Sequence, residues 1–249
     1  LIVLGLGIKS AMFPFHLWLP PAHGSATTAS SSVLSGLVVK GYIILMIRLF
    51  YKVFTIEVIR ELRITNMIFL FGLAGMIIGS IGAMKEGHIK RMLAYSSVAQ
   101  LGYVFMGIGL GTDIGIMAAC FQILVHACTK PMLFSCASAL SAGRHHNKKL
   151  HALRGAAYEN KLAGIGFTVG ALSMIGIPLF AGFAAKVFFA SATMAQPVKM
   201  WMTLLTLALS TVLNALYYIP AVTVLWSRPA EGDRKSTRLN SSHYSRSRM

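Results

Sequence analysis

Acidic residues and cysteines are scarce in this chain of 249 residues. Asp and Glu together number seven, and charged residues of both signs make up 12% of the chain, against roughly 25% in a soluble domain. Hydrophobic residues make up 55%, and the mean hydropathy is +0.66. This composition excludes an ordinary water-soluble domain and an intrinsically disordered chain. Three cysteines in a chain of this length exclude a disulfide framework.

The net charge of +16 comes from basic residues that lie mostly in short connections between apolar runs. Such loops are typical of a membrane protein, in which Lys and Arg set the orientation of the chain. A nucleic-acid-binding protein would instead carry a basic stripe on a polar surface. We therefore expect a lipid bilayer around the chain and no nucleic-acid partner.

Seven apolar spans are predicted, because a helix that crosses a bilayer needs about 20 mainly apolar residues. They are residues 1–13, 31–53, 65–84, 89–111, 114–141, 161–195 and 199–226. The sixth span is too long for one straight crossing and holds Pro178 between Gly176 and Gly182, so we predict a helix–loop–helix there. Pro131 and Pro220 predict interruptions in the fifth and seventh spans. The predicted fold is all-α, a polytopic transmembrane helix bundle with helices broken at Pro and Gly.

Lys and Arg are distributed unequally between the alternating loops. The loops after the second, fourth and sixth spans, with their flanks, hold five: Arg48, Lys52, Arg60, Arg63 and Lys199. The loops after the third and fifth spans and the end of the seventh hold nine: Lys85, Lys90, Arg91, Arg144, Lys148, Lys149, Arg154, Lys161 and Arg228. The richer side is expected to face the cytoplasm.

Both ends of the chain look unlike natural ends. Leu1 begins inside an apolar run without the features of a signal peptide, which predicts a truncation within a transmembrane helix. Residues 233–243 (DRKSTRLNSSH) match the translation, in one frame, of a common sequencing adapter. We therefore predict one transmembrane domain at 1–232 and interpret 233–249 as an assembly artefact, with a native basic tail as the alternative.

Four lysines lie inside the apolar spans: Lys9, Lys40, Lys130 and Lys186. A lysine at the centre of a membrane helix costs about 2.5–3.5 kcal/mol on insertion scales, so it persists where it lines a hydrated path or has a polar partner. The spans contain no Asp or Glu. Because burial disfavours the charged ammonium, lysines bridged by water and His could accept and release protons in series. The alternative is that they extend to the interface from near the helix ends.

Gln122, His126 and Lys130 follow one another at intervals of four residues and therefore share one helix face. Imidazole titrates close to physiological pH, so His126 is a predicted relay partner of Lys130. A histidine that is simply hydrogen-bonded in a helix contact is the alternative. His16 and His23, in the first loop, are either entry points for protons or solvated loop residues.

Other patterns do not define a metal or cofactor site. Cys120, Cys128 and Cys136 are too widely spaced for a zinc or iron–sulfur site and are interpreted as packing residues. The glycine-rich residues 107–115 join two apolar spans, so they are not a dinucleotide fingerprint. Their glycines and those of residues 72–82 predict close helix packing. The basic loop holds His145, His146 and His151, which are interpreted as solvated. We expect no cofactor and no bound metal.

Five segments, in this order, resemble one family: KSAMFPFHLWLPPAH, VLSGLVVKGYIILMIR, IKRMLAYSSVAQLGY, HACTKPMLF and LSMIGIPLFAGFAAK. They resemble the antiporter-like subunits shared by respiratory complex I (NADH-quinone oxidoreductase), membrane-bound hydrogenases and Mrp-type Na⁺/H⁺ antiporters. The resemblance covers the chain from Lys9 to about Trp226. The resemblance implies a fold of about fourteen helices with two inverted repeats, each with a broken helix, of which this chain would be the second half.

The resemblance also implies roles for single residues. Lys9 matches the lysine of the first broken helix, and Lys40 matches the connecting lysine after it. His126 and Lys130 match the central relay of the second repeat, and Lys186 matches the ionisable residue of its broken helix. The glutamate that pairs with the first lysine has no counterpart in this chain. Two further departures are Pro21, in place of an acid, and residues 28–32, in place of a PxPVSA stretch.

The predicted function is proton translocation, or Na⁺/H⁺ exchange, by one subunit of a respiratory, hydrogenase or Mrp complex. Its partners would be other membrane subunits in the plasma membrane of a bacterium or archaeon, and any redox chemistry would belong to them. One alternative is a stand-alone secondary transporter of a small solute with broken helices. A scaffold bundle without transport is the other.

Overall fold

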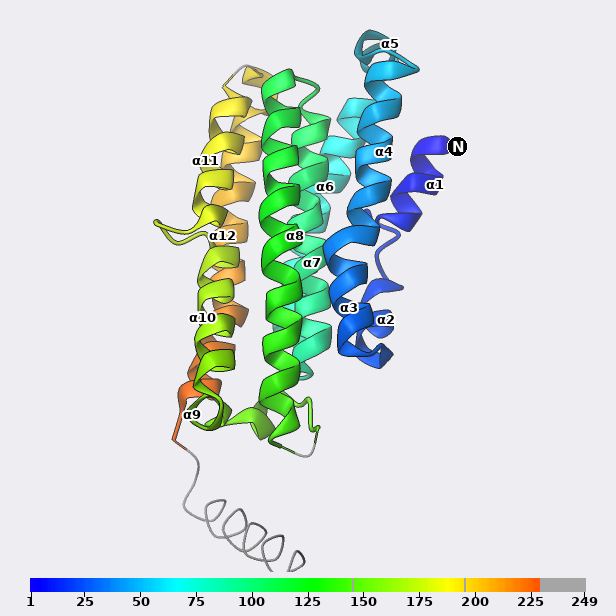
Figure 1. Cartoon of the computed structure of the whole chain (residues 1–249). Coiled ribbons are helices and arrows are strands. Elements are labelled where there is room, and N and C mark those ends of the chain that lie inside the picture. The colour runs from blue at the N-terminus through cyan, green and yellow to red at the C-terminus, as the bar shows by residue number, and fades with distance from the viewer. Residues whose placement is uncertain (145, 195, 229–249) are drawn as a thin grey trace, which may run out of the picture.

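A computed structural model describes residues 1–144, 146–194 and 196–228, which form helices joined by short loops. The longer helices lie side by side along one axis (Figure 1). His145 and the tail, including the interpreted artefact at 233–249, lie outside the described residues. The elements in chain order are α1 (Ile2–Lys9), α2 (Leu19–Ser25), α3 (Thr28–Val33), the π-helical η1 (Leu34–Val38), α4 (Val39–Lys52), α5 (Ile56–Glu61), α6 (Ile64–Lys85), α7 (Ile89–Gly109), α8 (Asp113–Ala142), η2 (Leu150–Leu153), α9 (Ala156–Glu159), α10 (Lys161–Ile175), α11 (Ala181–Thr193) and α12 (Pro197–Trp226).

Five helical segments within the described ranges are long and apolar enough to cross a membrane: Thr28–Lys52, Ile64–Lys85, Ile89–Gly109, Asp113–Ala142 and Pro197–Trp226. The sixth predicted span forms α10 and α11 with a loop between them, so the predicted helix–loop–helix is confirmed. The first predicted span contains only the short α1. The second span begins earlier than predicted, at Thr28, because α3 and η1 continue directly into α4.

α7 lies at the centre of the bundle, with 94% of its 18-residue apolar window buried. Glycines bring it against α6. A Cβ at Gly72 would lie 2.4 Å from the backbone nitrogen of Met106, and one at Gly102 would lie 2.6 Å from that of Met76. Any larger residue at either position would clash with backbone atoms, so the predicted role of the glycines in close helix packing is confirmed.

Pro131 does not interrupt its helix, contrary to the prediction. α8 continues through Pro131, and α12 continues through Pro220. Proline removes the N–H that would bond to the carbonyl four residues earlier, which here is that of Ala127. A Cβ on Gly36 of η1 would lie 3.5 Å from this carbonyl oxygen and 2.7 Å from the Pro131 ring. The neighbouring segment therefore covers the freed carbonyl, and the helix continues because protein surrounds it.

The break between α10 and α11 follows from glycine and proline. Gly176 ends α10 in a left-handed conformation with φ of 86°, and Pro178 follows it, as is common after a helix C-terminus. Gly182 then brings α11 so close to α10 that a Cβ there would lie 1.8 Å from the carbonyl oxygen of Ser173. The break leaves the last carbonyls of α10 without donors from the next turn.

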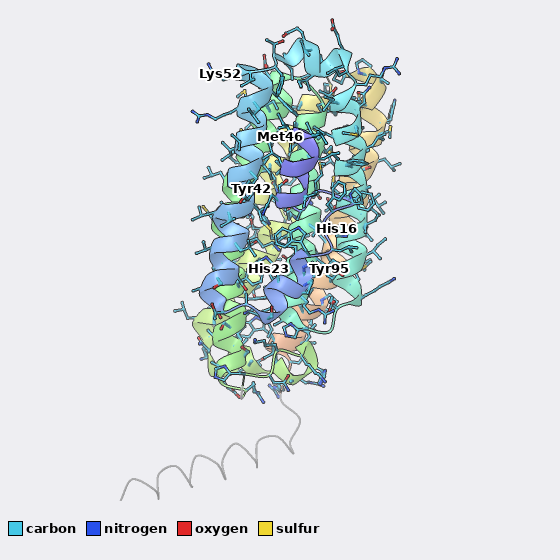
Figure 2. All side chains as sticks on the ribbon, turned by 90° about the vertical axis from the view of Figure 1, so that its right-hand side faces the viewer. His16, His23, Tyr42, Met46, Lys52 and Tyr95 are labelled. Atoms are coloured by element: carbon cyan, nitrogen blue, oxygen red, sulfur yellow. The ribbon has the colours of Figure 1, made fainter. Side chains whose placement is uncertain are left out.

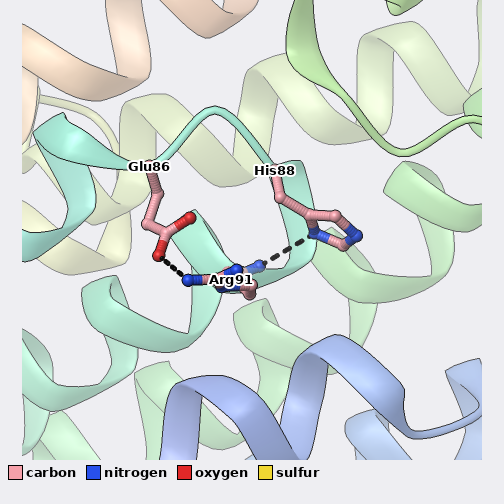
Figure 3. A network of polar contacts seen from close by, with 3 residues as sticks. All are labelled: Glu86, His88 and Arg91. Atoms are coloured by element: carbon pink, nitrogen blue, oxygen red, sulfur yellow. Dashed lines mark hydrogen bonds and ion pairs between the residues drawn. The ribbon is translucent and has the colours of Figure 1, made fainter.

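The loop after α6 and the loop after α8 meet at one end of the bundle. The backbone nitrogen of Ile89 donates to the carbonyl of Lys148 at 2.9 Å. Figure 3 shows the nearby surface contacts, in which Arg91 pairs with Glu86 at 2.7 Å and its backbone nitrogen donates to Nδ1 of His88. α5 and the C-terminal end of α11 lie at the opposite end (Figure 1). Successive loops therefore alternate between the two ends of the bundle, as the count of Lys and Arg assumed. Which end faces the cytoplasm stays a prediction.

The three cysteines of α8 differ in their surroundings. Cys136 packs against the largest core cluster, as interpreted. Cys120 and Cys128 are exposed, so the interpretation of these two as packing residues is wrong for the described chain. Their eight-residue spacing carried no information about which face of the helix is covered.

Candidate functional site

Lys130 lies at the centre of α8 with no exposed surface. Its Nζ donates to the carbonyl oxygen of Leu93 on α7 at 2.9 Å and to the hydroxyl of Tyr218 on α12 at 3.2 Å. Within the described residues, no carboxylate forms an ion pair with it. Neutral oxygens therefore hold this buried amine, and three helices position it.

A series of buried polar side chains continues from Lys130 across the interior. The Tyr218 hydroxyl lies 2.8 Å from Oγ of Ser96, and the Tyr217 hydroxyl lies 3.0 Å from the same atom. Tyr217 is also 2.8 Å from Oδ1 of Asn214. We call Tyr218, Ser96, Tyr217 and Asn214 the hydroxyl chain. All of its members are buried, and it joins α7 and α12 by hydrogen bonds rather than by apolar packing alone.

The broken helix meets the hydroxyl chain at the last two carbonyls of α10. The carbonyl oxygen of Met174 accepts from Nδ2 of Asn214 at 3.4 Å and from Nε2 of Gln100 at 3.3 Å. The carbonyl of Ile175, the next residue, accepts from Nζ of Lys186 on α11. These carbonyls are available because the helix stops at Gly176. The break thus supplies the polar atoms that connect Asn214 to Lys186.

Lys186 is partly buried on the far side of the break. Its Nζ also donates to Oγ1 of Thr211 on α12 at 2.6 Å and lies 5.7 Å from the ring centre of Tyr103. The Tyr103 hydroxyl in turn bonds to Ser210 at 2.9 Å. Lys130 and Lys186 are therefore connected through α12 and the end of α10.

A second group of buried ionisable residues adjoins Lys130 and comes from α2, α4 and α8. Nζ of Lys40 and both ring nitrogens of His126 and His23 have no hydrogen-bond partner among the described residues. The three side chains are nevertheless close enough to Lys130 or to one another to interact electrostatically. We call His23, Lys40 and His126 the histidine–lysine cluster. It adjoins Lys130, so Lys130 stands between the cluster and the hydroxyl chain.

The predicted shared face of α8 is confirmed. Gln122, His126 and Lys130 are all at most 3% exposed. Nε2 of Gln122 donates to Oε1 of Gln100 at 2.7 Å, which ties this face to α7 and, through Gln100, to Met174.

The histidines of the first loop are not solvated. His16 and His23 are 4% and 0% exposed, and they lie on the segment between α1 and α4, with His23 further along the bundle (Figure 2). His23 stacks on Phe134 of α8 with ring centres 4.8 Å apart. The alternative of solvated loop residues is therefore wrong for both, and a role in proton entry stays a prediction.

Lys9 stands apart from the other predicted site residues. It is the last residue of α1 and is exposed in the described chain. The structure therefore brings together Lys40, His126, Lys130 and Lys186, and leaves Lys9 outside the group.

Sequence reasoning missed the hydroxyl chain and two lysines that were counted as loop charges. Lys90 is 2% exposed and donates to the carbonyl of Ala26 at 2.8 Å. Lys199 donates to the carbonyl of Gly109, at the C-terminus of α7, at 2.6 Å. A signal for the hydroxyl chain was present in the seventh span, where Asn214, Tyr217 and Tyr218 follow the helical spacing of one face.

Chemically, the site offers amines, imidazoles, hydroxyls and amides, all of which can exchange or orient protons. Among the described residues, no group of three or more His, Cys, Asp or Glu is placed to hold a metal ion. Ionisable residues that face the interior of a transmembrane bundle are typical of proteins that transport ions. The fold and the site thus define a polytopic membrane protein with ionisable residues buried between its helices.

The family is shown by similarity. A family model described as NADH:quinone oxidoreductase/Mrp antiporter, TM, matches residues 1–214, and the chain belongs to this family. It is 30% identical over 226 residues to "NADH-quinone oxidoreductase subunit N 1" of Solibacter usitatus, covering 91% of this chain and 46% of the relative. It is 33% identical over 225 residues to "NADH-quinone oxidoreductase subunit M" of Rickettsia prowazekii, covering 88% of this chain and 43% of the relative. The chain thus spans less than half the length of these relatives.

Solved structures of three multi-subunit membrane complexes contain a similar chain. The Mrp complex from Dietzia sp. has a TM-score of 0.83 at 28% identity, over 91% of this chain and 41% of the other. An archaeal membrane-bound sulfane sulfur reductase has a TM-score of 0.82 at 25% identity, over 92% and 47%. Respiratory complex I from Thermus thermophilus has a TM-score of 0.72 at 25% identity, over 92% and 49%. The chain is an antiporter-like, multi-pass membrane subunit with relatives in bacteria and archaea.

Proposed function

We propose that this chain moves protons, or exchanges Na⁺ for protons, across the plasma membrane as one subunit of a larger complex. The path would run through the histidine–lysine cluster, Lys130, the hydroxyl chain and Lys186. Other membrane subunits would be its partners. Lys9 would belong to a neighbouring part of the path, as its match to the first broken helix suggests.

The observation that carries the proposal is a series of hydrogen bonds that leads from Lys130 to Asn214 and, through two adjacent carbonyls at the end of α10, reaches Lys186. Each contact from Lys130 to Asn214 is a hydrogen bond between side chains of at most 3.2 Å. Asn214 and Lys186 then bond to the adjacent carbonyls of Met174 and Ile175. A bundle that served only as a scaffold would gain nothing from buried amines, because each one costs free energy in a membrane.

The histidine–lysine cluster supports the same proposal from the other side. Buried polar groups in proteins almost always have hydrogen-bond partners, and water serves where protein does not. We therefore expect water molecules to join Lys40, His126 and His23 and to lead protons to Lys130.

The test uses the full-length subunit assembled in its complex, in sealed membrane vesicles. Lys130→Ala and Lys186→Ala are each compared with Lys161→Ala, which changes an exposed lysine at the start of α10. Proton uptake is followed with a pH-sensitive dye, and sodium uptake with a radioactive tracer. We expect both interior variants to assemble and to lose transport to the level of vesicles without the complex, and Lys161→Ala to keep it.

Unchanged proton and sodium transport in both interior variants would overturn the proposal. Uptake of an organic solute by the isolated full-length subunit, with the same loss in the two variants, would instead favour the stand-alone secondary transporter.

A further inference from the structure

Lys90 lies at the start of α7, at the end of the bundle where the loops after α6 and α8 meet, which we call the loop end. The backbone nitrogen of Ile89, the residue before it, donates to the carbonyl of Lys148 in the loop after α8 at 2.9 Å. Lys148 is half-buried and close enough to Lys90 to interact electrostatically. Lys90 itself is only 2% exposed. It is therefore a buried amine directly beside the loops.

The surroundings of Lys90 do little to stabilise its charge. Its Nζ donates to one neutral acceptor, the carbonyl of Ala26 at the C-terminus of α2, at 2.8 Å. Both ion pairs among the described residues lie elsewhere, and the acid nearest in sequence, Glu86, pairs with Arg91. The first turn of a helix also disfavours a cation, because the helix dipole is positive there. A neutral amide would serve as well as a donor to this carbonyl, so the hydrogen bond alone does not account for a lysine here.

α7 sets the spacing between Lys90 and Lys130. Nζ of Lys130 bonds to the carbonyl of Leu93, which is three residues after Lys90 and so about 4.5 Å further along the helix axis. Side chains lean toward the N-terminus of their own helix, so that of Lys90 points to the loop end and away from Lys130. A proton that passes between the two amines therefore needs an intermediate group.

His23 is placed to be that intermediate. It is fully buried, three residues before Ala26 in the chain, and it interacts electrostatically with both Lys90 and Lys130. Its ring stacks on Phe134, one helical turn beyond Lys130 in the direction of the loop end, with ring centres 4.8 Å apart. Neither ring nitrogen has a hydrogen-bond partner in the described part of the chain. Imidazole can accept a proton on one nitrogen and release one from the other.

We propose that Lys90 is a further relay residue, which joins the loop end of the bundle to the histidine–lysine cluster through His23. The inference rests on the proposed function and adds where its path reaches water. A proton arrives at Lys90 from the loop end, the amine passes a proton to one nitrogen of His23, and the other nitrogen passes one on to Lys130. Water molecules bridge these groups, as they commonly do between buried polar groups without protein partners. Lys90 regains its proton from the loop end, and the same steps in reverse release protons there.

The test separates an exchangeable proton from a hydrogen bond. Lys90→Arg and Lys90→Gln both keep a donor for the Ala26 carbonyl, but Arg holds its proton too tightly to release it and Gln has none to exchange. Lys90→His is the poorer match in shape, yet its imidazole exchanges protons near physiological pH. In the assembled complex in sealed vesicles, we expect proton transport per complex to fall about a hundredfold for Lys90→Arg and Lys90→Gln, the size typical of losing a proton-transfer group. Lys90→His should stay about tenfold faster than either.

Two further variants control the comparison. Lys149→Gln makes the same chemical change at an exposed position of the loop after α8 and should leave the rate unchanged. His23→Phe keeps a ring to stack on Phe134 and removes both nitrogens. It should lower transport about as much as Lys90→Arg, and it tests the route even if the Lys90 variants fail to assemble.

A role of Lys90 in holding α2 against α7 alone would give the opposite order, with Lys90→Arg the fastest of the three. Lys90→His no faster than Lys90→Arg would overturn the inference, and so would transport at the natural rate in His23→Phe. Natural rates in these variants alongside loss of transport in Lys130→Ala leave the proposed function standing and reject the route to the loop end alone. Unchanged transport in both Lys130→Ala and Lys186→Ala rejects both.

Discussion

The two sides of Lys130 differ in how their buried polar groups are satisfied. On one side, the hydroxyl chain gives each polar side chain a protein partner, ending at the carbonyls of the broken helix. On the other side, the histidine–lysine cluster holds an amine and two imidazoles without partners among the described residues. Both sides are equally hidden from solvent, with Lys40 only 3% exposed and Lys130 fully buried.

This difference separates two uses of a buried polar group. A hydrogen-bonded group contributes to stability and fixes the geometry around it, whereas a buried group without a partner costs about 1–3 kcal/mol. The hydroxyl chain should therefore be rigid and sensitive to packing changes. Substitutions in the histidine–lysine cluster should change the stability little and impair transport alone.

The largest expected change in stability is at Gly182, close to the end of α10 that meets the hydroxyl chain. Gly182→Ala places a methyl group 1.8 Å from the Ser173 carbonyl, so α11 must move away from α10. We expect a loss of about 3 kcal/mol in stability, at the upper end for overpacking, and a failure of most of the complex to assemble. The measurement is the amount of assembled complex and its thermal unfolding midpoint in detergent.

Gly41→Ala is the matched control on the opposite side, next to Lys40 in sequence. A Cβ there has no neighbour within 4 Å, so the change should be neutral or should stabilise α4 by about 1 kcal/mol through helix propensity. Equal losses of stability in the two variants would show that the close contact between Gly182 and the Ser173 carbonyl does not hold α11 against α10.

The next largest effect on stability distinguishes Lys130 from Lys40. Lys130→Met leaves the Leu93 carbonyl and the Tyr218 hydroxyl without their donor and should cost about 1–3 kcal/mol. Lys40→Met removes a buried amine without a partner and should be neutral or stabilising. Urea or thermal unfolding of the purified complex compares them, and a larger loss for Lys40→Met would contradict the distinction between the two sides.

A smaller effect is expected when a single hydroxyl is removed. Tyr218→Phe keeps the ring and removes the bond to Lys130, at a cost of about 1–1.5 kcal/mol. Tyr42→Phe, at a half-buried position of α4 (Figure 2), should change stability by less than about 0.5 kcal/mol. The same unfolding assay reports both, and indistinguishable midpoints would mean that the hydroxyl chain does not stabilise the bundle.

The smallest effect concerns a histidine that does have a partner. Burial, followed by the nearby Lys148 and Arg91, lowers the pKa of His88 from its ordinary value, and its Nδ1 accepts from the backbone of Arg91 (Figure 3). Because the folded protein binds this proton less readily than the unfolded chain, the contribution of His88 is complete above about pH 6.5 and is lost as the pH falls below it.

His88→Asn keeps an N-cap acceptor without titrating in this range. We expect the unfolding midpoint of the natural protein to fall slightly more than that of His88→Asn between pH 7 and pH 5. Parallel curves would show that the charge of His88 does not matter for folding.

Much of the fold followed from local sequence properties. The apolar runs predicted the crossing helices, and Gly176 with Pro178 predicted the broken helix, because glycine and proline both disfavour a continuous helix. The same reasoning gave a wrong prediction at Pro131, where the helix continues. Its effect depends on whether a neighbour covers the freed Ala127 carbonyl, and that neighbour, Gly36, lies far away in sequence.

The candidate site was predictable only where its residues stood out against their surroundings. A lysine or histidine inside an apolar run is conspicuous, so Lys40, His126, Lys130 and Lys186 were found. Tyrosine, serine and asparagine carry no charge and were passed over, although Asn214 and Tyr217 share a helix face. Lys90 was counted as a loop charge because nothing local shows that the Ala26 carbonyl lies within reach.

Sequence alone therefore determined that this chain is a bundle of membrane-crossing helices, that one helix is broken, and that Lys40, Lys130 and Lys186 lie inside the bundle, since hydropathy and backbone geometry act over a few neighbouring residues. Tertiary structure alone decided how each amine is satisfied: Lys130 by oxygens from α7 and α12, Lys186 by the end of α10, and Lys40 by no described side chain. The reason is that a hydrogen bond depends on atoms about 3 Å apart in space, and the Tyr218 hydroxyl that accepts from Lys130 lies 88 residues away from it in the chain.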